Sequence, residues 1–226
     1  MLKAKVIAVT KGVVEGIDSA QDLISYCARV SNPSNQLNMD TAQKLIDYLR
    51  KHKHWSPLDM ANVVVEVECP RDIMRQLLRH ASMKPQEFSQ RYADVNALGD
   101  SFVIREARKQ DTKNRQNSIN FDLDDEVDEF IYNEWKRRQQ DILDIVQEHY
   151  RWGIEHGIAK ECCRVILPEG NTMSRAYFNG TIRSWIHYLE VRLEEGVTQA
   201  EHVWLARIIT EAINKTFHVA DETWNG

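Results

Sequence analysis

A short polar stretch between residues 79 and 92 carries the side chains best suited to chemistry. It reads Arg-His-Ala-Ser-Met-Lys-Pro-Gln-Glu-Phe-Ser-Gln-Arg-Tyr, and Arg79, His80, Glu87, Ser89 and Arg91 are its groups that prefer water or an anion. Arginine offers planar paired donors for a phosphate, while hydroxyl and backbone N–H groups complete the shell. The stretch therefore predicts a site for a phosphorylated ligand, with a solvated surface loop as the alternative.

The segment before this stretch is predicted to be an amphipathic helix. Pro70 suits its first position, where the missing N–H costs nothing. Its apolar stripe consists of Ile73, Met74, Leu77 and Leu78. Arg71, Arg75 and Arg79 are spaced by four, so neighbouring cations repel one another. An anion bound against this face would relieve the repulsion, whereas a solvated basic face is the other interpretation.

Three further segments of the sequence contain possible motifs. Residues 54–59 read His-Trp-Ser-Pro-Leu-Asp, residues 163–168 read Cys-Arg-Val-Ile-Leu-Pro, and residues 182–192 read Ile-Arg-Ser-Trp-Ile-His-Tyr-Leu-Glu-Val-Arg. Gln199 and Glu201 follow them. Together with residues 79–92, these segments resemble the motifs of the flavin-dependent thymidylate synthases. Those motifs are Arg-His-Arg-x-x-Ser-x-Asn-x-x-Ser-x-Arg, His-x-Ser/Thr-Pro-x-Glu-His, Ala-Arg-x-x-Leu-Pro, Leu-Arg-Ser-Leu-x-His-Phe-Leu-x-Leu-Arg and Gln-x-Glu.

The sequence departs from these motifs at several positions. Ala81 stands in place of the second signature arginine, and Lys84 and Gln86 replace the usual serine and asparagine. Asp59-Met60 replaces Glu-His. The loss at Ala81 removes a cation that would face flavin phosphate or folate.

The resemblance implies methylation of deoxyuridylate (dUMP) at C5 to give thymidylate (dTMP). Methylenetetrahydrofolate would supply the carbon, reduced FAD the hydride, and NADPH would reduce the flavin. It also implies a homotetramer with sites shared between subunits. The alternatives are a related C5 modification of dUMP, such as hydroxymethylation, and a non-catalytic nucleotide-binding protein on the same scaffold.

The resemblance also assigns residues to two overlapping sites. The dUMP set is Gln76, Arg79, Glu87, Phe88, Ser89, Gln90, Arg91, Arg164 and Arg192. The FAD set is Ser56, Arg79, His80, Ala81, Glu87, Thr181, Arg183 and His187. Arg192 is assigned the catalytic role, because a fixed positive charge stabilises an anion developing on uracil. Ser89 is interpreted as an anion-binding hydroxyl rather than a nucleophile, since no feature supplies a base.

Helical spacing separates Arg192 from the other assigned residues of its segment. Arg183 and His187 are four apart and share a face, whereas Arg192 lies roughly 140° from His187 in a continuous helix. Either the helix ends before Arg192, or Arg192 faces a site that another chain completes. His52 and His54 are candidate acid–base groups, with a structural role as the alternative.

Length and composition limit the classes of protein to which this sequence can belong. The chain has 226 residues, 42% of them hydrophobic, and a formal charge of −5. These values predict one domain over residues 1–226 and argue against nucleic acid as a partner. No apolar run has the roughly 20 residues that a membrane span needs. The scatter of Cys27, Cys69, Cys162 and Cys163 predicts neither disulfides nor a metal site and favours the cytoplasm.

The order of elements predicts an α+β fold, a mixed or antiparallel sheet packed with several helices. Expected strands are residues 1–9, Asn62–Glu68 and Phe102–Ile104, and Met173–Gly180 is expected to be an extended segment. Expected helices are Ala20–Val30, Met39–His52, Asp122–Trp152, Ile158–Cys163, 181–194 and 198–219, and Lys109–Asn120 is expected to be a loop. The long helix, about 45 Å in length and ended by Gly153, predicts a contact between subunits.

Overall fold

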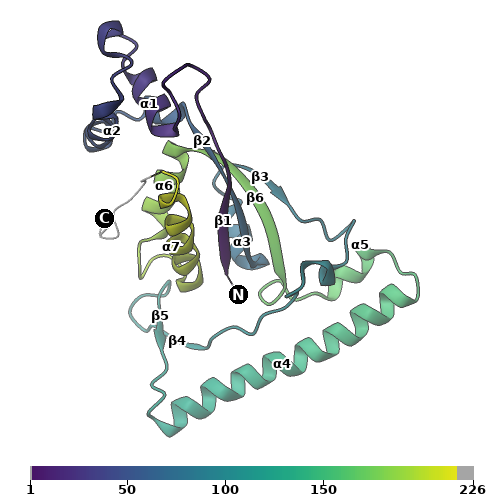
Figure 1. Cartoon of the computed structure of the whole chain (residues 1–226). Coiled ribbons are helices and arrows are strands. Elements are labelled where there is room, and N and C mark those ends of the chain that lie inside the picture. Colours follow the sequence, from purple (N-terminus) through teal and green to yellow (C-terminus); the bar gives the residue numbers. More distant parts are fainter. Residues whose placement is uncertain (1, 218–226) are drawn as a thin grey trace.

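A four-stranded antiparallel sheet forms the centre of the computed structural model, which describes residues 2–217 (Figure 1). The spatial order is β1-β2-β6-β3. The strands are β1 (Lys3–Val9), β2 (Asn62–Pro70), β6 (Met173–Thr181) and β3 (Lys84–Glu87). With the helices described below, this architecture confirms the expected α+β class, and every strand pairing in it is antiparallel.

The two faces of the sheet differ in character because side chains alternate along a strand. On β2, Val63, Val65 and Val67 point into the core and are fully buried. The opposite face carries Glu66 and Glu68, whose carboxylates pair with lysines of β1 at 2.9 and 3.1 Å. One face therefore holds the hydrophobic core, and the other carries charged pairs.

Five helices supply most of the remaining core residues. They are α1 (Ala20–Ala28), α2 (Ala42–Lys51), α3 (Arg71–Leu77), α6 (Ile182–Arg192) and α7 (Ala200–Asn214). Buried side chains from all five belong to one cluster with the valines of β2. Trp185 of α6 is fully buried, and its indole N–H donates to the Val63 carbonyl at 3.0 Å. This bond fixes α6 on the sheet and so determines where its polar residues emerge.

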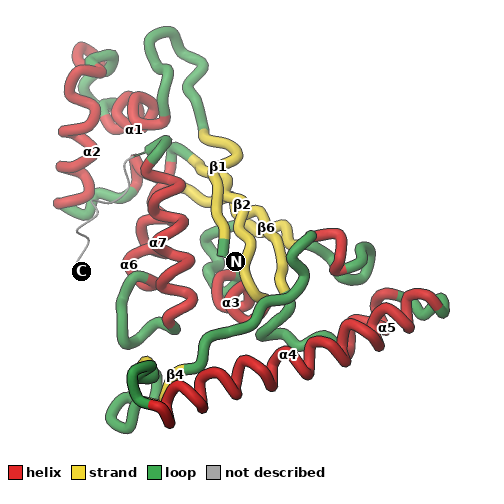
Figure 2. Tube along the Cα trace, turned by 60° about the horizontal axis from the view of Figure 1, so that its bottom comes forward, coloured by secondary structure: helices red, strands yellow, loops and turns green. Residues whose placement is uncertain are grey.

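The long helix α4 (Glu126–Glu155) stands apart from this body (Figure 2). Of its 30 residues, only Asp128, Gln139, Leu143, Tyr150 and Gly153 are buried. Large apolar side chains exposed along it are Val127, Phe130, Ile131, Trp135, Ile142, Ile145 and Trp152. Little of this helix is therefore covered by the rest of the described chain.

Gly153 does not end α4, contrary to the expectation from sequence. The helix continues to Glu155, and Gly157, with φ of 76°, follows its last turn. A Cβ atom at Gly153 would lie 2.9 Å from Cys163 Sγ in α5 (Lys160–Cys163). The glycine therefore permits close approach of α5 rather than acting as a cap.

Several other expected boundaries are wrong. Pro70 ends β2 and precedes α3, so it is not the first residue of the helix. Phe102 makes only an isolated bridge to Thr172 instead of a strand over Phe102–Ile104. The expected loop Lys109–Asn120 is part of a hairpin of β4 (Arg108–Gln110) and β5 (Ser118–Asn120). The segment 181–194 is helical only to Arg192, and residues 218–219 of the last expected helix lie outside the described part.

Within residues 2–217, no helix combines the length and apolar character that crossing a membrane requires.

Candidate active site

The end of α3 and the last turn of α6 meet at a cluster of polar groups. Arg192 Nε donates to His80 Nε2 at 2.9 Å, and Arg192 Nη2 donates to the Gln76 backbone carbonyl at 3.3 Å. The helix α6 continues through Arg192, so the option that it ends earlier is wrong. Arg192 thus faces α3, on a different side of α6 from His187, as the helical spacing predicts.

His80 is held neutral by its surroundings. Burial, followed by the positive charges of Arg192, His187 and Arg79, lowers the pKa of His80 from 6.5 to about 4. A neutral imidazole has one ring nitrogen with a free lone pair, and Nε2 accepts from Arg192. The proton of His80 is therefore on Nδ1.

Two neutral histidines, His80 half-buried and His202 buried, predict a loss of stability in mild acid. His202 of α7 is fully buried, and burial, followed by the charges of Arg192 and His80, lowers its pKa to about 3. Because both pKa values are lower in the folded state, the unfolded chain binds more protons as pH falls below about 6.5. We expect the free energy of unfolding to be highest above this pH and to fall as pH drops towards 4.

Urea unfolding at a series of pH values measures this effect. Glu201 and Glu68, whose pKa values are lowered, lose their contribution only below their ordinary value of 4.5, so the histidine window lies above theirs. The variant His202→Asn should flatten the pH dependence between 6.5 and 4.5. An unfolding free energy that is constant across this window would contradict the assignment.

The assigned flavin residues of α6 border a cavity of about 410 Å³. Its lining is Trp55, Asp59, Ser82, Arg183, Ser184, Ile186, His187 and Glu190. Arg183 Nη1 donates to Asp59 Oδ2 at 3.0 Å, and the Thr181 hydroxyl donates to Asp59 Oδ1 at 2.9 Å. Thr181 also caps α6 by accepting from the Ser184 N–H at 3.1 Å. One carboxylate, Asp59, therefore orients two of the assigned residues.

Two further assigned flavin residues, Ser56 and Ala81, are next in the chain to residues that line this cavity, whereas Glu87 contacts Arg71 and Ser174 instead. Ser56 is exposed and directly follows Trp55, at the start of the short 3₁₀ helix Ser56–Asp59. Ala81 is exposed and precedes Ser82. His187 Nδ1 lies 3.7 Å from a Glu190 carboxylate oxygen. The cavity thus draws on three segments that are far apart in the sequence.

The assigned nucleotide residues at and after the end of β3 begin with Glu87, which lies near the other end of α3. Glu87 accepts from Arg71 Nη1 at 3.3 Å and from the Ser174 hydroxyl at 2.9 Å. Arg91 Nε pairs with Glu161 at 3.0 Å, and the Arg91 backbone N–H lies 3.4 Å from Ser89 Oγ. These contacts hold the segment between the sheet and α5.

Two more of the assigned residues flank Ser89. The Phe88 N–H donates to the Arg175 carbonyl at 2.8 Å, which extends the pairing beyond β3. Gln90 is buried, and its Nε2 has no partner. A buried amide N–H without a partner is costly, so a ligand that accepts it would be stabilised.

The arginines around α3 divide into paired and unpaired groups. Arg71, Arg75 and Arg91 each pair with a glutamate. The side chains of Arg79 and Arg164 make no hydrogen bond or ion pair with any described residue, whereas Arg192 contacts His80 and a carbonyl but no carboxylate. Burial and the charges of Arg75 and Arg164 lower the pKa of Arg71 against the opposing charge of Glu87, which places Arg164 near Arg71.

These free cations stand at opposite ends of a short helix. Arg164 is near Arg71, the first residue of α3, and Arg79 follows its last turn beside His80. The rise of α3 from Arg71 to Leu77 is about 9 Å. Free cations near both ends of a helix suit an extended anionic ligand better than a single inorganic ion.

Sequence reasoning did not identify several residues of this region. Asp59 was noted only as a departure from the motif, although its position in place of glutamate was the available signal. Trp55, Ser82 and Glu190 line the cavity without having been predicted. Tyr188 stands where the motif has phenylalanine, and its hydroxyl contacts His202. Among residues 2–217, no group of three or more His, Cys, Asp or Glu side chains is arranged to hold a metal ion.

The sequence matches a protein family described as "Thymidylate synthase complementing protein" over residues 12–217. A probable flavin-dependent thymidylate synthase of Paramecium bursaria Chlorella virus 1 is 46% identical, over 96% of this chain and 95% of that protein. A flavin-dependent thymidylate synthase of a Synechocystis species is 40% identical, over 88% of this chain and 86% of that protein.

A solved structure shares the fold. It is the UMP/dUMP methylase PolB from Streptomyces cacaoi bound with 5-Br dUMP, with a TM-score of 0.77 and 23% identity. The match covers 97% of this chain and 92% of that one. At this identity the similarity concerns the arrangement of the backbone.

Proposed function

The chain belongs to the flavin-dependent thymidylate synthase family, and we propose that it converts dUMP to dTMP at the site between α3 and α6. The observation that carries this proposal is the pair of unpaired arginines at the two ends of α3. In the proposed reaction, methylenetetrahydrofolate provides the carbon and NADPH provides the reducing equivalents. The hydride reaches the nucleotide by way of FAD, which is the chemistry that the flavin supplies when bound.

The nucleotide is proposed to lie along α3. Its phosphate binds Arg164 and Arg91 together with the Ser89 hydroxyl, because guanidinium and hydroxyl donors match phosphate oxygens. The partner-free amide N–H of Gln90 adds a further donor nearby. The uracil ring then lies at the opposite end, beside Arg192, Gln76 and Arg79.

Arg192 is proposed to stabilise negative charge on the uracil ring. Its bonds to His80 and to the Gln76 carbonyl fix the guanidinium plane and leave the other N–H groups for the ligand. His80 stays neutral, so it adds no competing positive charge and orients Arg192 by accepting its Nε–H. A preorganised cation of this kind stabilises charge that develops during the reaction.

The cavity next to α6 has donors suited to FAD. Arg183 retains N–H groups beyond the one given to Asp59, and His187, Ser82 and Ser184 add further polar groups. This set matches the anionic diphosphate of a flavin dinucleotide. Neither site needs a protein nucleophile, since the protein's part is to position the ligands and stabilise charge.

The flavin part of the proposal is tested by the absorbance spectrum of the purified protein after FAD is added and the excess removed. We expect a bound flavin spectrum, and a reduced yield in the double variant Arg183→Ala/His187→Ala. The exposed variant Arg207→Ala on α7, whose side chain pairs with Glu195, is the control and should bind like wild type. A protein that retains no flavin under any condition would contradict the proposal.

The exposed apolar side of α4 predicts a homotetramer with sites shared between subunits. Trp135 is 50% exposed and Ile142 is 55% exposed, so the double variant Trp135→Glu/Ile142→Glu should weaken assembly without disturbing the monomer fold. Light scattering measures the mass, and circular dichroism checks the fold. A monomeric species that turns over dUMP at the wild-type rate would rule out shared sites.

A further inference from the structure

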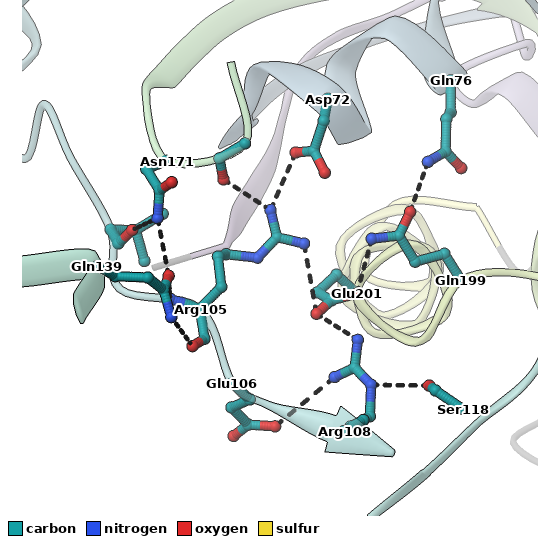
Figure 3. A network of polar contacts seen from close by, with 12 residues as sticks. Asp72, Gln76, Arg105, Glu106, Arg108, Ser118, Gln139, Asn171, Gln199 and Glu201 are labelled. Atoms are coloured by element: carbon teal, nitrogen blue, oxygen red, sulfur yellow. Dashed lines mark hydrogen bonds and ion pairs between the residues drawn. The ribbon is translucent and has the colours of Figure 1, made fainter. Parts of the chain in front are cut away.

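A row of buried and half-buried polar side chains joins α6, α7 and α3. The Tyr188 hydroxyl lies 3.2 Å from His202 Nε2, and His202 Nδ1 lies 3.1 Å from Gln76 Oε1. Gln76 Nε2 donates to Gln199 Oε1 at 2.7 Å, and Gln199 Nε2 donates to Glu201 Oε2 at 3.0 Å. Figure 3 shows the latter part, with the Gln76 amide turned towards Gln199 and Gln199 towards Glu201.

The carboxylate at the end of the row determines its direction. Burial raises the pKa of Glu201, but the hydrogen bond from Arg108 and the charge of Arg105 outweigh this effect, so the net pKa is lowered. An ionised carboxylate only accepts hydrogen bonds. Gln199 must therefore turn its NH₂ group to Glu201 and its oxygen to Gln76.

The same reasoning assigns the donor and the acceptor in each remaining hydrogen bond of the row. Because Gln199 presents an oxygen, Gln76 must present its NH₂ group there, and its own oxygen then faces His202. His202 must carry its proton on Nδ1, and its Nε2 accepts from the Tyr188 hydroxyl. If the Gln76 amide were flipped, two oxygens would meet at Gln199 and two N–H groups at His202.

We propose that this row is a one-way chain of hydrogen bonds that fixes the side-chain amide of Gln76 in the nucleotide site. His202 and Gln199 are positioning residues, and Glu201 sets the direction. The inference rests on the proposed function, because its consequence depends on Gln76 contacting the uracil ring.

The hydrogen-bond chain leaves the Gln76 amide with groups that can recognise the edge of a uracil ring. A glutamine amide has two N–H donors and two acceptor lone pairs, and the chain uses one of each. One N–H donor and one acceptor lone pair of Gln76 remain free, and the hydrogen-bond chain fixes their positions. Uracil offers an N3–H donor between two carbonyl oxygens. A flipped Gln76 amide would place its oxygen against a uracil oxygen and its N–H against the uracil N3–H.

Two features distinguish the pair of Tyr188 and His202 within the row. Tyr188 takes a position where the family motif has phenylalanine, and both side chains are fully buried. A buried hydroxyl without a partner is costly, and His202 is the hydrogen-bond partner of this one. His202 is neutral because its pKa is lowered to about 3, so it has one donor and one acceptor at working pH.

The direction of the chain is tested on the ligand-free protein by ¹⁵N NMR of the histidine rings. The His202 signals are identified by their loss in His202→Asn. We expect a neutral ring with the proton on Nδ1 and a bare Nε2. A proton on Nε2 would overturn the proposed direction, whatever the protein's activity.

The positioning role is tested by titrating dUMP into the flavin-loaded protein. His202→Leu removes the donor to Gln76 and should weaken binding about tenfold, whereas His202→Asn keeps a donor near Nδ1 and should stay within about threefold of wild type. The control Ser25→Ala removes a buried hydroxyl that donates to the Ala42 carbonyl, outside this row, and should leave nucleotide affinity unchanged.

The outcomes separate this inference from the proposed function. Wild-type protein that does not bind dUMP contradicts the proposed function at the first titration. Wild-type binding with equal losses in His202→Leu and His202→Asn, or with no loss in either, overturns the positioning role alone. Adding Tyr188→Phe to His202→Leu should cause no further loss, since the row is already broken.

Discussion

Replacement of Arg192 by lysine is expected to slow methyl transfer about 100-fold while flavin reduction by NADPH stays near the wild-type rate. Lysine keeps the charge but lacks the planar donor group. Its single ammonium nitrogen cannot reproduce the fixed arrangement in which Arg192 Nε and Nη2 bond His80 Nε2 and the Gln76 carbonyl. Because the charge on uracil develops in the transition state, the loss should fall on the rate of that step.

Stopped-flow measurement of the two half-reactions separates these effects. Arg207→Lys is the matched control, since Arg207 is an exposed arginine of α7 paired with Glu195, and neither half-reaction should change. Equal losses of rate in both half-reactions of Arg192→Lys would show a general structural role. An unchanged methyl-transfer rate would remove Arg192 from the chemistry.

Loss of either proposed phosphate arginine should weaken dUMP binding by about 1.5–3 kcal/mol, as expected for a charge-assisted hydrogen bond, with little change in flavin binding. Arg164→Ala should lie at the upper end of this range, because Arg164 has no partner among the described residues. Arg91→Ala should lie at the lower end, because Arg91 must give up part of its contact with Glu161 to bind phosphate.

Isothermal titration with dUMP measures both losses. Arg75→Ala is the control, since Arg75 lies on the same face of α3 but pairs with Glu169, and it should cost much less. An unchanged dUMP affinity in Arg164→Ala would show that the phosphate does not bind at Arg164, which directly follows α5. A parallel loss of flavin would indicate that the two arginines support the fold rather than the nucleotide.

The helices and the first strands could be predicted because their signals are local. The alternating valines of β2 and Ser19, the N-cap of α1, are recognised from neighbouring residues alone. The strand β3 could not be read in this way, because Lys84–Glu87 carries no alternation and is fixed by pairing with β6, about ninety residues further on. Pro70 likewise suits a strand end as well as a helix start, and only the sheet decides.

The candidate site shows the same division between local and distant information. The motifs located Arg79, His80, Arg183 and Arg192, but not which of them touch. The contact between Arg192 and His80 joins residues 112 positions apart and depends on how α6 packs against α3. His202 belongs to no chemical motif, and its role follows only from the direction of the hydrogen bonds that meet it.

A single turnover without oxygen tests the central claim most directly. Protein with reduced FAD is mixed with dUMP and methylenetetrahydrofolate, and the nucleotide product is identified by mass spectrometry. The proposed function predicts dTMP, a gain of one CH₂ group, together with oxidation of the flavin. A hydroxymethylated nucleotide would show a different C5 modification, and unchanged dUMP with the flavin still reduced would show that the chain binds these ligands without catalysing the reaction.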